Sequence, residues 1–220
     1  MSKEVYNITC PKCSAMQDVE LYSFIDGNLD SEKKEQLMYN KLNRVTCSDC
    51  GFDLRIDCPL TYQDKKNNIL IFWMPEAKDI NIEKILEDFD ELIAFHLPKN
   101  EVSNIRLVTT RVELIELIYM IESKINHRVV EYIKYSIFER NPEKLNPLVN
   151  KLLLNIEDST EDELCFVIQN IETYELGEVL RYGRNAYQSL EKLFNEDPEE
   201  FLLMFPGPYI CASYFINNER

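Results

Sequence analysis

Two Cys-x-x-Cys pairs near the amino terminus constrain this 220-residue chain more than any other feature of its sequence. The first pair is Cys10 and Cys13, the second is Cys47 and Cys50, and 33 residues lie between the pairs. Each pair can wrap a tight turn that directs two sulfurs at one point, and two such turns supply a tetrahedral four-sulfur site. The sequence therefore predicts one structural zinc ion bound by all four cysteines, in a small zinc-ribbon module.

Residues beside the cysteines bear on how tightly the two turns can form. Pro11 restricts the first turn, and Gly51 permits the backbone angles that such a knuckle commonly uses, whereas Ser14 stands where the first knuckle would have a glycine. A module of this size buries little core, so we expect zinc binding, at about 10 to 16 kcal/mol apparent free energy, to hold it together. Buried free cysteines and a redox switch that releases the ion are the alternatives. Two regular pairs favour the metal.

Cysteine usage and charge limit the setting of the protein. The chain has seven cysteines, an odd number, which suits metal binding in a reducing compartment better than a disulfide framework. The sequence shows neither a signal-peptide-like start nor a run of about 18 apolar residues. We therefore expect a cytoplasmic protein with no membrane partner. The net charge of −15 disfavours nucleic acid and anionic membranes as default partners.

The hydrophobic pattern divides the chain near residue 76. Before that point short strands are expected, including a hairpin between residues 61–62 and 69–73, and a helix from Asp30 or Ser31 to about Leu42. After it, longer amphipathic periodicity begins. The predicted fold class is α+β: an N-terminal zinc ribbon with a β-hairpin over 1–76, then a mixed helical and strand body over 77–220, which could pack as one continuous unit.

The body carries several local signals that predict its elements. Thr110 and Glu113 form a capping-box pattern at the start of one helix, and Asn126 can cap the next, which should end near Asn141. The other expected elements are a helix over 82–93, a strand over 105–109, a strand over 164–168 that pairs with residues 178–182, and a helix over 185–194.

At the cysteines the chain resembles the CpXC domain family of bacteria and archaea. The resemblance lies in Cys10-Pro11-Lys12-Cys13, in Leu42-Asn43 and Cys47-Ser48-Asp49-Cys50-Gly51, in Pro59 to Asp64, in Ile105 to Val108 with Glu113, and in Asn126 to Glu131. The resemblance implies a zinc site and a bacterial setting, but no reaction. The second pair lacks the proline of the family pattern, which leaves the ligands themselves intact.

Catalytic patterns are scarce in the sequence. His127 and Glu131 are four residues apart on an expected helix and could share a metal or a proton, although such a pair is more often a surface contact. Cys58, Cys165 and Cys211 fit packing positions better than reactive ones. The sequence contains neither a phosphate-binding glycine loop nor a nucleophile motif. It thus favours a protein that is not an enzyme.

The leading hypothesis is a non-enzymatic interaction or adaptor protein whose zinc is structural. A protein partner would dock beside the knuckles or near residues 65–69. One alternative is nucleic-acid binding through the ribbon. A separate candidate in the body is a stacking and phosphate surface for single strands, although packed helices explain the pattern more simply; its residues are Tyr119, Tyr132, Tyr135, Phe138, Arg128, Lys134 and Arg140. The other alternative is an enzyme with a site around His127 and Glu131.

Overall fold

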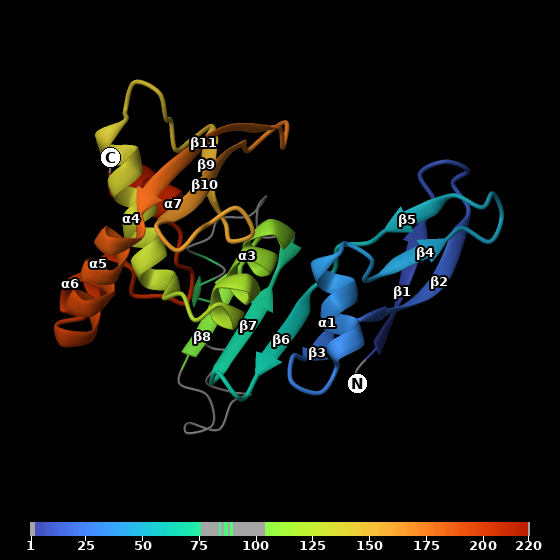
Figure 1. Cartoon of the computed structure of the whole chain (residues 1–220). Helices are drawn as coiled ribbons and strands as arrows, with labels where there is room; N and C mark the ends of the chain where they lie inside the picture. Colours follow the sequence, from blue (N-terminus) through green and yellow to red (C-terminus); the bar gives the residue numbers. More distant parts are fainter. Residues whose placement is uncertain (1–2, 76–83, 85, 88, 90–103, 220) are drawn as a thin grey trace. The chain divides into compact units, whose positions relative to one another are not determined.

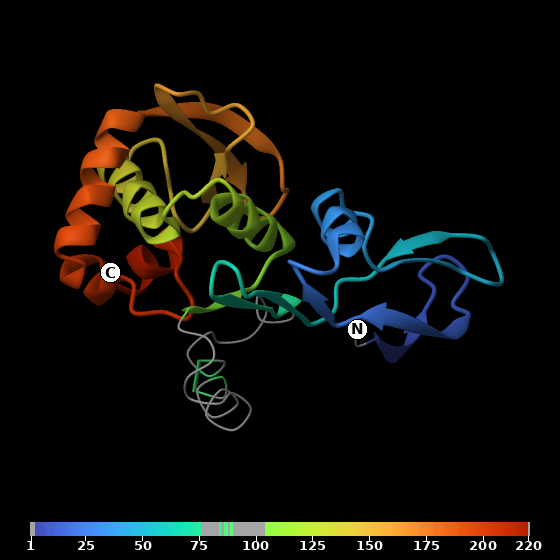
Figure 2. The same cartoon turned by 60° about the horizontal axis from the view of Figure 1, so that its bottom comes forward.

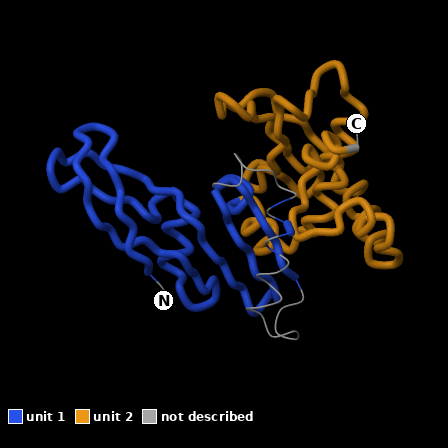
Figure 3. Tube along the Cα trace, turned by 180° about the vertical axis from the view of Figure 1, so that it is seen from behind, with its two compact units in different colours: residues 1–115 blue, residues 116–220 orange. Residues whose placement is uncertain are grey.

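The structure, a computed structural model, describes residues 3–75, 84, 86–87, 89 and 104–219. It contains both helices and strands, with a cysteine cluster between N-terminal hairpins, which confirms the α+β class (Figure 1). The chain forms two compact units, Met1–Ile115 and Glu116–Arg220 (Figure 3). The boundary predicted near residue 76 lies outside the described residues and stays a prediction, as does most of the helix expected over 82–93.

Two short antiparallel hairpins build the ribbon of the first unit. Strand β1 (Lys3–Thr9) pairs with β2 (Met16–Tyr22), and β4 (Arg44–Thr46) pairs with β5 (Asp53–Arg55). A Cys-x-x-Cys pair occupies the turn of each hairpin. The pattern therefore places both cysteine pairs at hairpin tips, although β1 itself was not predicted.

Helix α1 (Ser31–Met38) ends about four residues before the predicted end at Leu42. The cause lies in Asn40, which adopts a left-handed φ of 57°. Its N–H donates to the carbonyl of Leu37, and the N–H of Lys41 donates to that of Gln36, at 3.1 and 2.7 Å. This is the Schellman arrangement that closes a helix, with asparagine in the place that glycine usually takes.

A four-stranded sheet completes the first unit, in the order β3-β6-β7-β8. The predicted hairpin is present as β6 (Leu60–Asp64) and β7 (Ile69–Trp73), while β3 (Phe24–Asp26) and β8 (Asn104–Val108) add in parallel at the two edges. Four of the five β7 side chains are buried, as its continuous apolar sequence requires.

The two side-chain caps predicted for the body, at Thr110 and Asn126, are confirmed. At α3 (Arg111–Glu122), the Oγ1 of Thr110 accepts from the N–H of Glu113, and the Glu113 carboxylate accepts from the N–H of Thr110, at 3.3 and 3.1 Å. At α4 (His127–Arg140), the Oδ1 of Asn126 accepts from the N–H groups of two first-turn residues. The side chains satisfy backbone donors that the first turn leaves free.

The second unit packs a three-stranded antiparallel sheet with helices (Figure 2). Its elements are β9 (Asn150–Asn155), β10 (Glu163–Asn170), β11 (Leu176–Gly183), α5 (Arg184–Glu196), α6 (Glu199–Met204) and α7 (Ala212–Glu219). The predicted β10–β11 pairing is present, whereas β9 was not predicted. Helix α4 contacts α5, α6 and α7, so it is central to this unit. No helix in the described part of the chain is long and apolar enough to cross a membrane.

Candidate metal centre

The two cysteine turns have the same backbone hydrogen bonding. In the first turn the N–H of Cys10 donates to the carbonyl of Ala15 at 2.8 Å, and the N–H of Ser14 donates back to the carbonyl of Cys10 at 2.9 Å. In the second turn Cys47 donates to the carbonyl of Phe52 at 2.8 Å, and Gly51 donates back at 3.0 Å. Two segments far apart in sequence thus fold into equivalent knuckles, which is the local geometry that the repeated spacing predicts.

Ser14 and Gly51 occupy the same position in the two knuckles. Their φ angles are 60° and 69°, so both residues are in the left-handed region. Glycine adopts this region freely, whereas a residue with a Cβ adopts it at a cost. The serine that the sequence marks as unusual therefore keeps the glycine conformation.

The knuckles bring four sulfurs together. The Sγ of Cys10 lies 3.7 Å from that of Cys50, the Sγ of Cys13 lies 3.6 Å from that of Cys47, and all four sulfurs lie within 4.8 Å of one another. Metal–sulfur bonds of 2.3 Å in a tetrahedron require sulfurs about 3.8 Å apart, whereas a disulfide requires about 2 Å. The spacing therefore fits four ligands of one ion. Within the described residues it is the one such cluster of His, Cys, Asp or Glu.

Contacts outside the cysteines hold the knuckles in place. The Oε1 of Gln17, on β2, accepts from the N–H and Oγ of Ser48 in the second knuckle, at 2.9 and 3.2 Å. The Nζ of Lys12, in the first knuckle, lies 6.0 Å from the ring centroid of Phe52. These bridges between the hairpins were not predicted, because each joins residues 31 to 40 positions apart that share no motif.

The thiols do not have equal proton affinities. Burial acts to raise the pKa of Cys10, but hydrogen bonds from the backbone N–H groups of Cys13 and Lys12, together with those to the Cys13 and Cys47 sulfurs, outweigh it and lower this pKa to about 7. The N–H of Ala15 acts to lower the pKa of Cys13, yet hydrogen bonding with the other sulfurs raises it to about 12. Adjacent thiols resist ionising together because their charges repel. A bound cation would remove that resistance, so the four-sulfur donor set fits a divalent metal.

The remaining candidate cysteines lie outside this cluster. Cys58 is buried, accepts a hydrogen bond from the Nδ2 of Asn43 at 3.3 Å, and has a pKa raised by burial. Cys165 is buried on β10, and Cys211 lies before α7. Cys211 is half-buried, so burial supports the expected packing role for Cys58 and Cys165.

The proposed pairing of His127 with Glu131 needs correction. Glu131 is only 6% exposed, so it makes no surface contact. Its Oε1 accepts from the Nζ of Lys134 at 2.7 Å, and its Oε2 accepts from the N–H of Ala212 at 2.8 Å. Lys134 is also buried, which removes it from the phosphate-contacting surface considered above. The enzyme alternative and the stacking surface of the body therefore each lose a residue, whereas nucleic-acid binding through the ribbon is not affected.

A buried charged triad takes the place of that pair. Lys134 lies between Glu116 and Glu131, 2.7 Å from an oxygen of each. The N–H of Leu154, on β9, also donates to Glu116, at 2.5 Å. The triad was not predicted, although two signals pointed to it: Glu116 interrupts an apolar run, and Lys134 follows Glu131 at helical spacing.

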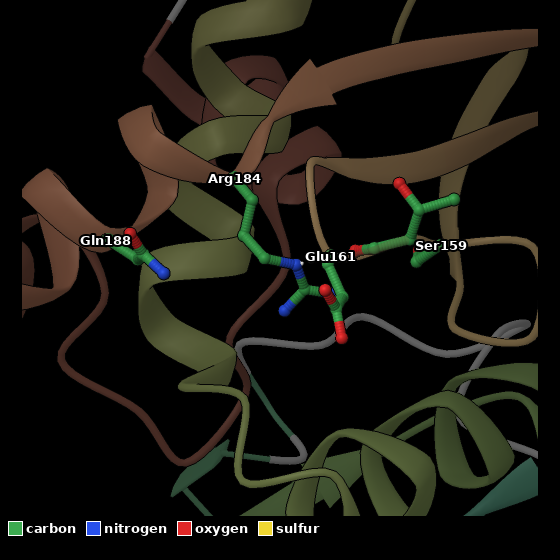
Figure 4. A pocket seen from close by; sticks show the side chains of 5 residues that line it. Ser159, Glu161, Arg184 and Gln188 are labelled. Carbon is green, nitrogen blue, oxygen red and sulfur yellow. Dashed lines mark hydrogen bonds between the residues drawn. The ribbon is translucent and has the colours of Figure 1, made fainter.

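An open depression in the second unit is lined by Ser159, Thr160, Glu161, Arg184 and Gln188 (Figure 4). Its volume is about 610 Å³, and the Nε of Arg184 donates to the carbonyl of Thr160 at 2.8 Å. None of the four predicted metal ligands lines it. One guanidinium and one carboxylate in a shallow hollow do not define a reaction.

Comparison with known protein families matches residues 8–134 to the family described as CpXC protein. The match includes both knuckles and continues beyond Ile115 into the second unit. No curated protein and no solved structure matches the chain.

Proposed function

The chain belongs to the CpXC protein family, and from that premise we propose that it is a zinc-binding interaction protein in which the metal is structural. The convergence of four cysteine sulfurs at two hairpin tips carries this proposal. Zinc accepts tetrahedral sulfur coordination without redox chemistry, and four protein ligands leave no open position for a substrate. A structural role follows from that full coordination shell.

The proposed ion would replace the core that the ribbon lacks. The strands of its two hairpins contain a single buried side chain, that of Leu21, and two of the ligands, Cys10 and Cys47, are buried at 1% and 2% exposure. With so little apolar burial, metal binding supplies much of the folding free energy of such a module. None of the seven cysteines, all within the described part of the chain, forms a disulfide, which suits the reducing cytoplasm where we place the protein.

The proposed protein partner docks beside the knuckles rather than near residues 65–69. Met16 and Phe52, which follow the first and second knuckles, are 70% and 39% exposed. In the segment 65–69 the exposed residues, Lys65, Lys66 and Asn68, are polar, and Ile69, its one apolar residue, is buried. The knuckle tips therefore offer apolar surface on a frame that the metal would hold rigid.

Metal analysis of untagged, reduced protein tests the structural-zinc proposal. We expect one zinc per chain in the wild type, loss of zinc in Cys50→Ser, and full retention in Cys58→Ser, which is the matched control because Cys58 lies outside the cluster. Cobalt substitution should give the absorption of a tetrahedral thiolate site. A wild type without metal, or an equal loss in both variants, contradicts the proposal.

Affinity capture with the zinc-loaded full chain tests the interaction role. We expect a stoichiometric protein partner that is lost with Phe52→Asp, while zinc content stays at the wild-type value. Capture of no such partner, together with turnover of a metabolite by the purified protein, would instead identify an enzyme.

A further inference from the structure

Strand β11 forms an open edge of the three-stranded sheet, whose order is β11-β10-β9. The strand, labelled β11 in Figure 1, is eight residues long. Six of its residues are exposed. Edge strands present unpaired backbone donors and acceptors, and proteins commonly shorten or cover them. In the described part of the chain β10 is the one strand paired with β11.

The register shows which backbone groups of β11 face outward. Leu180 and Tyr182 lie opposite Phe166 and Leu164 of β10, and the N–H of Arg184 continues this register by donating to the carbonyl of Asp162 at 2.7 Å. Hydrogen-bonded residues alternate along an antiparallel pair. The N–H and C=O groups of the intervening residues, Val179, Arg181 and Gly183, therefore point away from β10.

Apolar side chains accompany this edge. Val179 is 49% exposed and Leu176 is 65% exposed. Val179 lies opposite Val167 of β10, which in turn lies opposite Leu153 of β9, so the three side chains form a row across one face of the sheet. An added strand could extend that row with an aliphatic side chain.

The charge around the edge is acidic. Glu172, Glu175 and Glu178 lie on β11 or the turn before it, and within the described residues no Lys or Arg forms a salt bridge with any of them. The basic residue of the strand, Arg181, is already paired with Glu163 at 3.1 Å. A basic segment would therefore meet uncompensated carboxylates along the first half of β11.

We propose that β11 binds a partner protein by accepting an extended segment as a fourth strand, one in which aliphatic residues alternate with Lys or Arg. Backbone hydrogen bonds to Val179 and Arg181 give the affinity, and the three carboxylates select basic side chains. This surface lies in the second unit and uses no metal, so it goes beyond the zinc-dependent role. A second copy of the chain is a poorer occupant, because it would bring the same carboxylates and a net charge of −15.

A synthetic eleven-residue peptide of alternating Val and Lys tests the proposal by fluorescence anisotropy with the full-length, metal-loaded protein. A peptide with Glu in place of every Lys is the charge control. In Val179→Pro the proline removes only an outward N–H, so the pairing with β10 remains intact. Val179→Thr keeps that N–H and is the matched control. Thermal unfolding checks that both variants keep the wild-type stability of the fold.

We expect the Lys peptide to bind the wild type and the Glu peptide not to bind. Val179→Pro should weaken binding by about tenfold, the effect of losing one backbone hydrogen bond, and Val179→Thr by much less. Glu175→Gln with Glu178→Gln should reduce the salt dependence of binding. Failure of the Lys peptide to bind, or equal binding by Val179→Pro and Val179→Thr, overturns the proposal. So does a dimer in sedimentation that Val179→Pro dissociates. Each result is independent of zinc content, so failure here leaves the structural-zinc proposal standing.

Discussion

The Nζ of Lys134 lies 2.7 Å from the Oε1 of Glu116, and these side chains are only 4% and 6% exposed. Glu131 binds the same ammonium group, so one cation serves two carboxylates inside the second unit. Further hydrogen bonds from backbone N–H groups of Leu154 and Ala212 satisfy the carboxylates. The triad thus joins α3, α4, β9 and the start of α7 by polar contacts.

Replacing Lys134 with methionine should destabilise the second unit strongly. The change leaves two carboxylates in the interior without their cation, and breaking a buried pair on one side costs about 3 to 5 kcal/mol. Urea unfolding, followed by circular dichroism, measures the loss. Lys192→Met is the control: its pair with Glu196 is largely exposed, and we expect a change below about 1 kcal/mol. Equal losses of stability in the two variants would show that the buried triad contributes no more to the free energy of unfolding than an exposed ion pair does.

The Glu116 carboxyl should make stability depend on pH. Burial raises the pKa of Glu116 above its ordinary 4.5; Lys134 acts to lower it and Glu131 acts to raise it. A raised folded-state pKa means that the folded protein binds the proton more tightly than the unfolded chain does. The resulting stabilisation is complete below the unfolded value and is lost as the pH rises through the folded-state pKa.

Comparison with Glu116→Gln isolates this titration from that of other groups. From about pH 4.5 upward, the wild type should lose free energy of unfolding relative to the glutamine variant, each measured by urea unfolding at several pH values. A difference that stays constant with pH would mean that the pKa of Glu116 is not raised. If the wild type instead gains free energy of unfolding relative to the glutamine variant as the pH rises, the pKa of Glu116 is lowered.

Substitutions at the two equivalent knuckle positions should have opposite effects. Ser14→Gly removes a Cβ from a left-handed residue and should stabilise the metal-loaded ribbon by about 1 kcal/mol. Gly51→Ala should destabilise it by a similar amount through the backbone alone, because no atom lies within 4 Å of the added Cβ. Competition with a zinc chelator should show a zinc affinity about fivefold higher for Ser14→Gly and about fivefold lower for Gly51→Ala. Effects of the same sign would contradict the equivalence of the knuckles.

Asn126→Ala should lower stability by about 1 kcal/mol, because the N–H groups of Arg128 and Val129 would lose the side-chain oxygen that caps α4. Asn126→Asp keeps an acceptor and should remain close to the wild type. Thermal unfolding of the three proteins provides the comparison. A loss as large in Asn126→Asp as in Asn126→Ala would show that the cap is not the cause.

The sequence alone determined the features whose geometry is local. Each knuckle is set by residues within six positions of one another, and the caps at Thr110 and Asn126 by residues three positions apart or fewer. Side-chain spacing fixes such contacts directly, so each knuckle and the starts of α3 and α4 follow from the pattern. The early end of α1 was missed because asparagine, rather than glycine, takes the left-handed position.

Only the tertiary structure decided which distant groups meet. Glu116 and Lys134 are 18 positions apart, and Glu116 and the backbone of Leu154 are 38 apart. The interruption of an apolar run by Glu116 marks that carboxylate as unusual, but its partners depend on how elements distant in sequence pack, which no local pattern gives. The same reason hid the role of β11: whether a strand is internal or at an edge depends on which strands pair with it, and β9 had not been predicted.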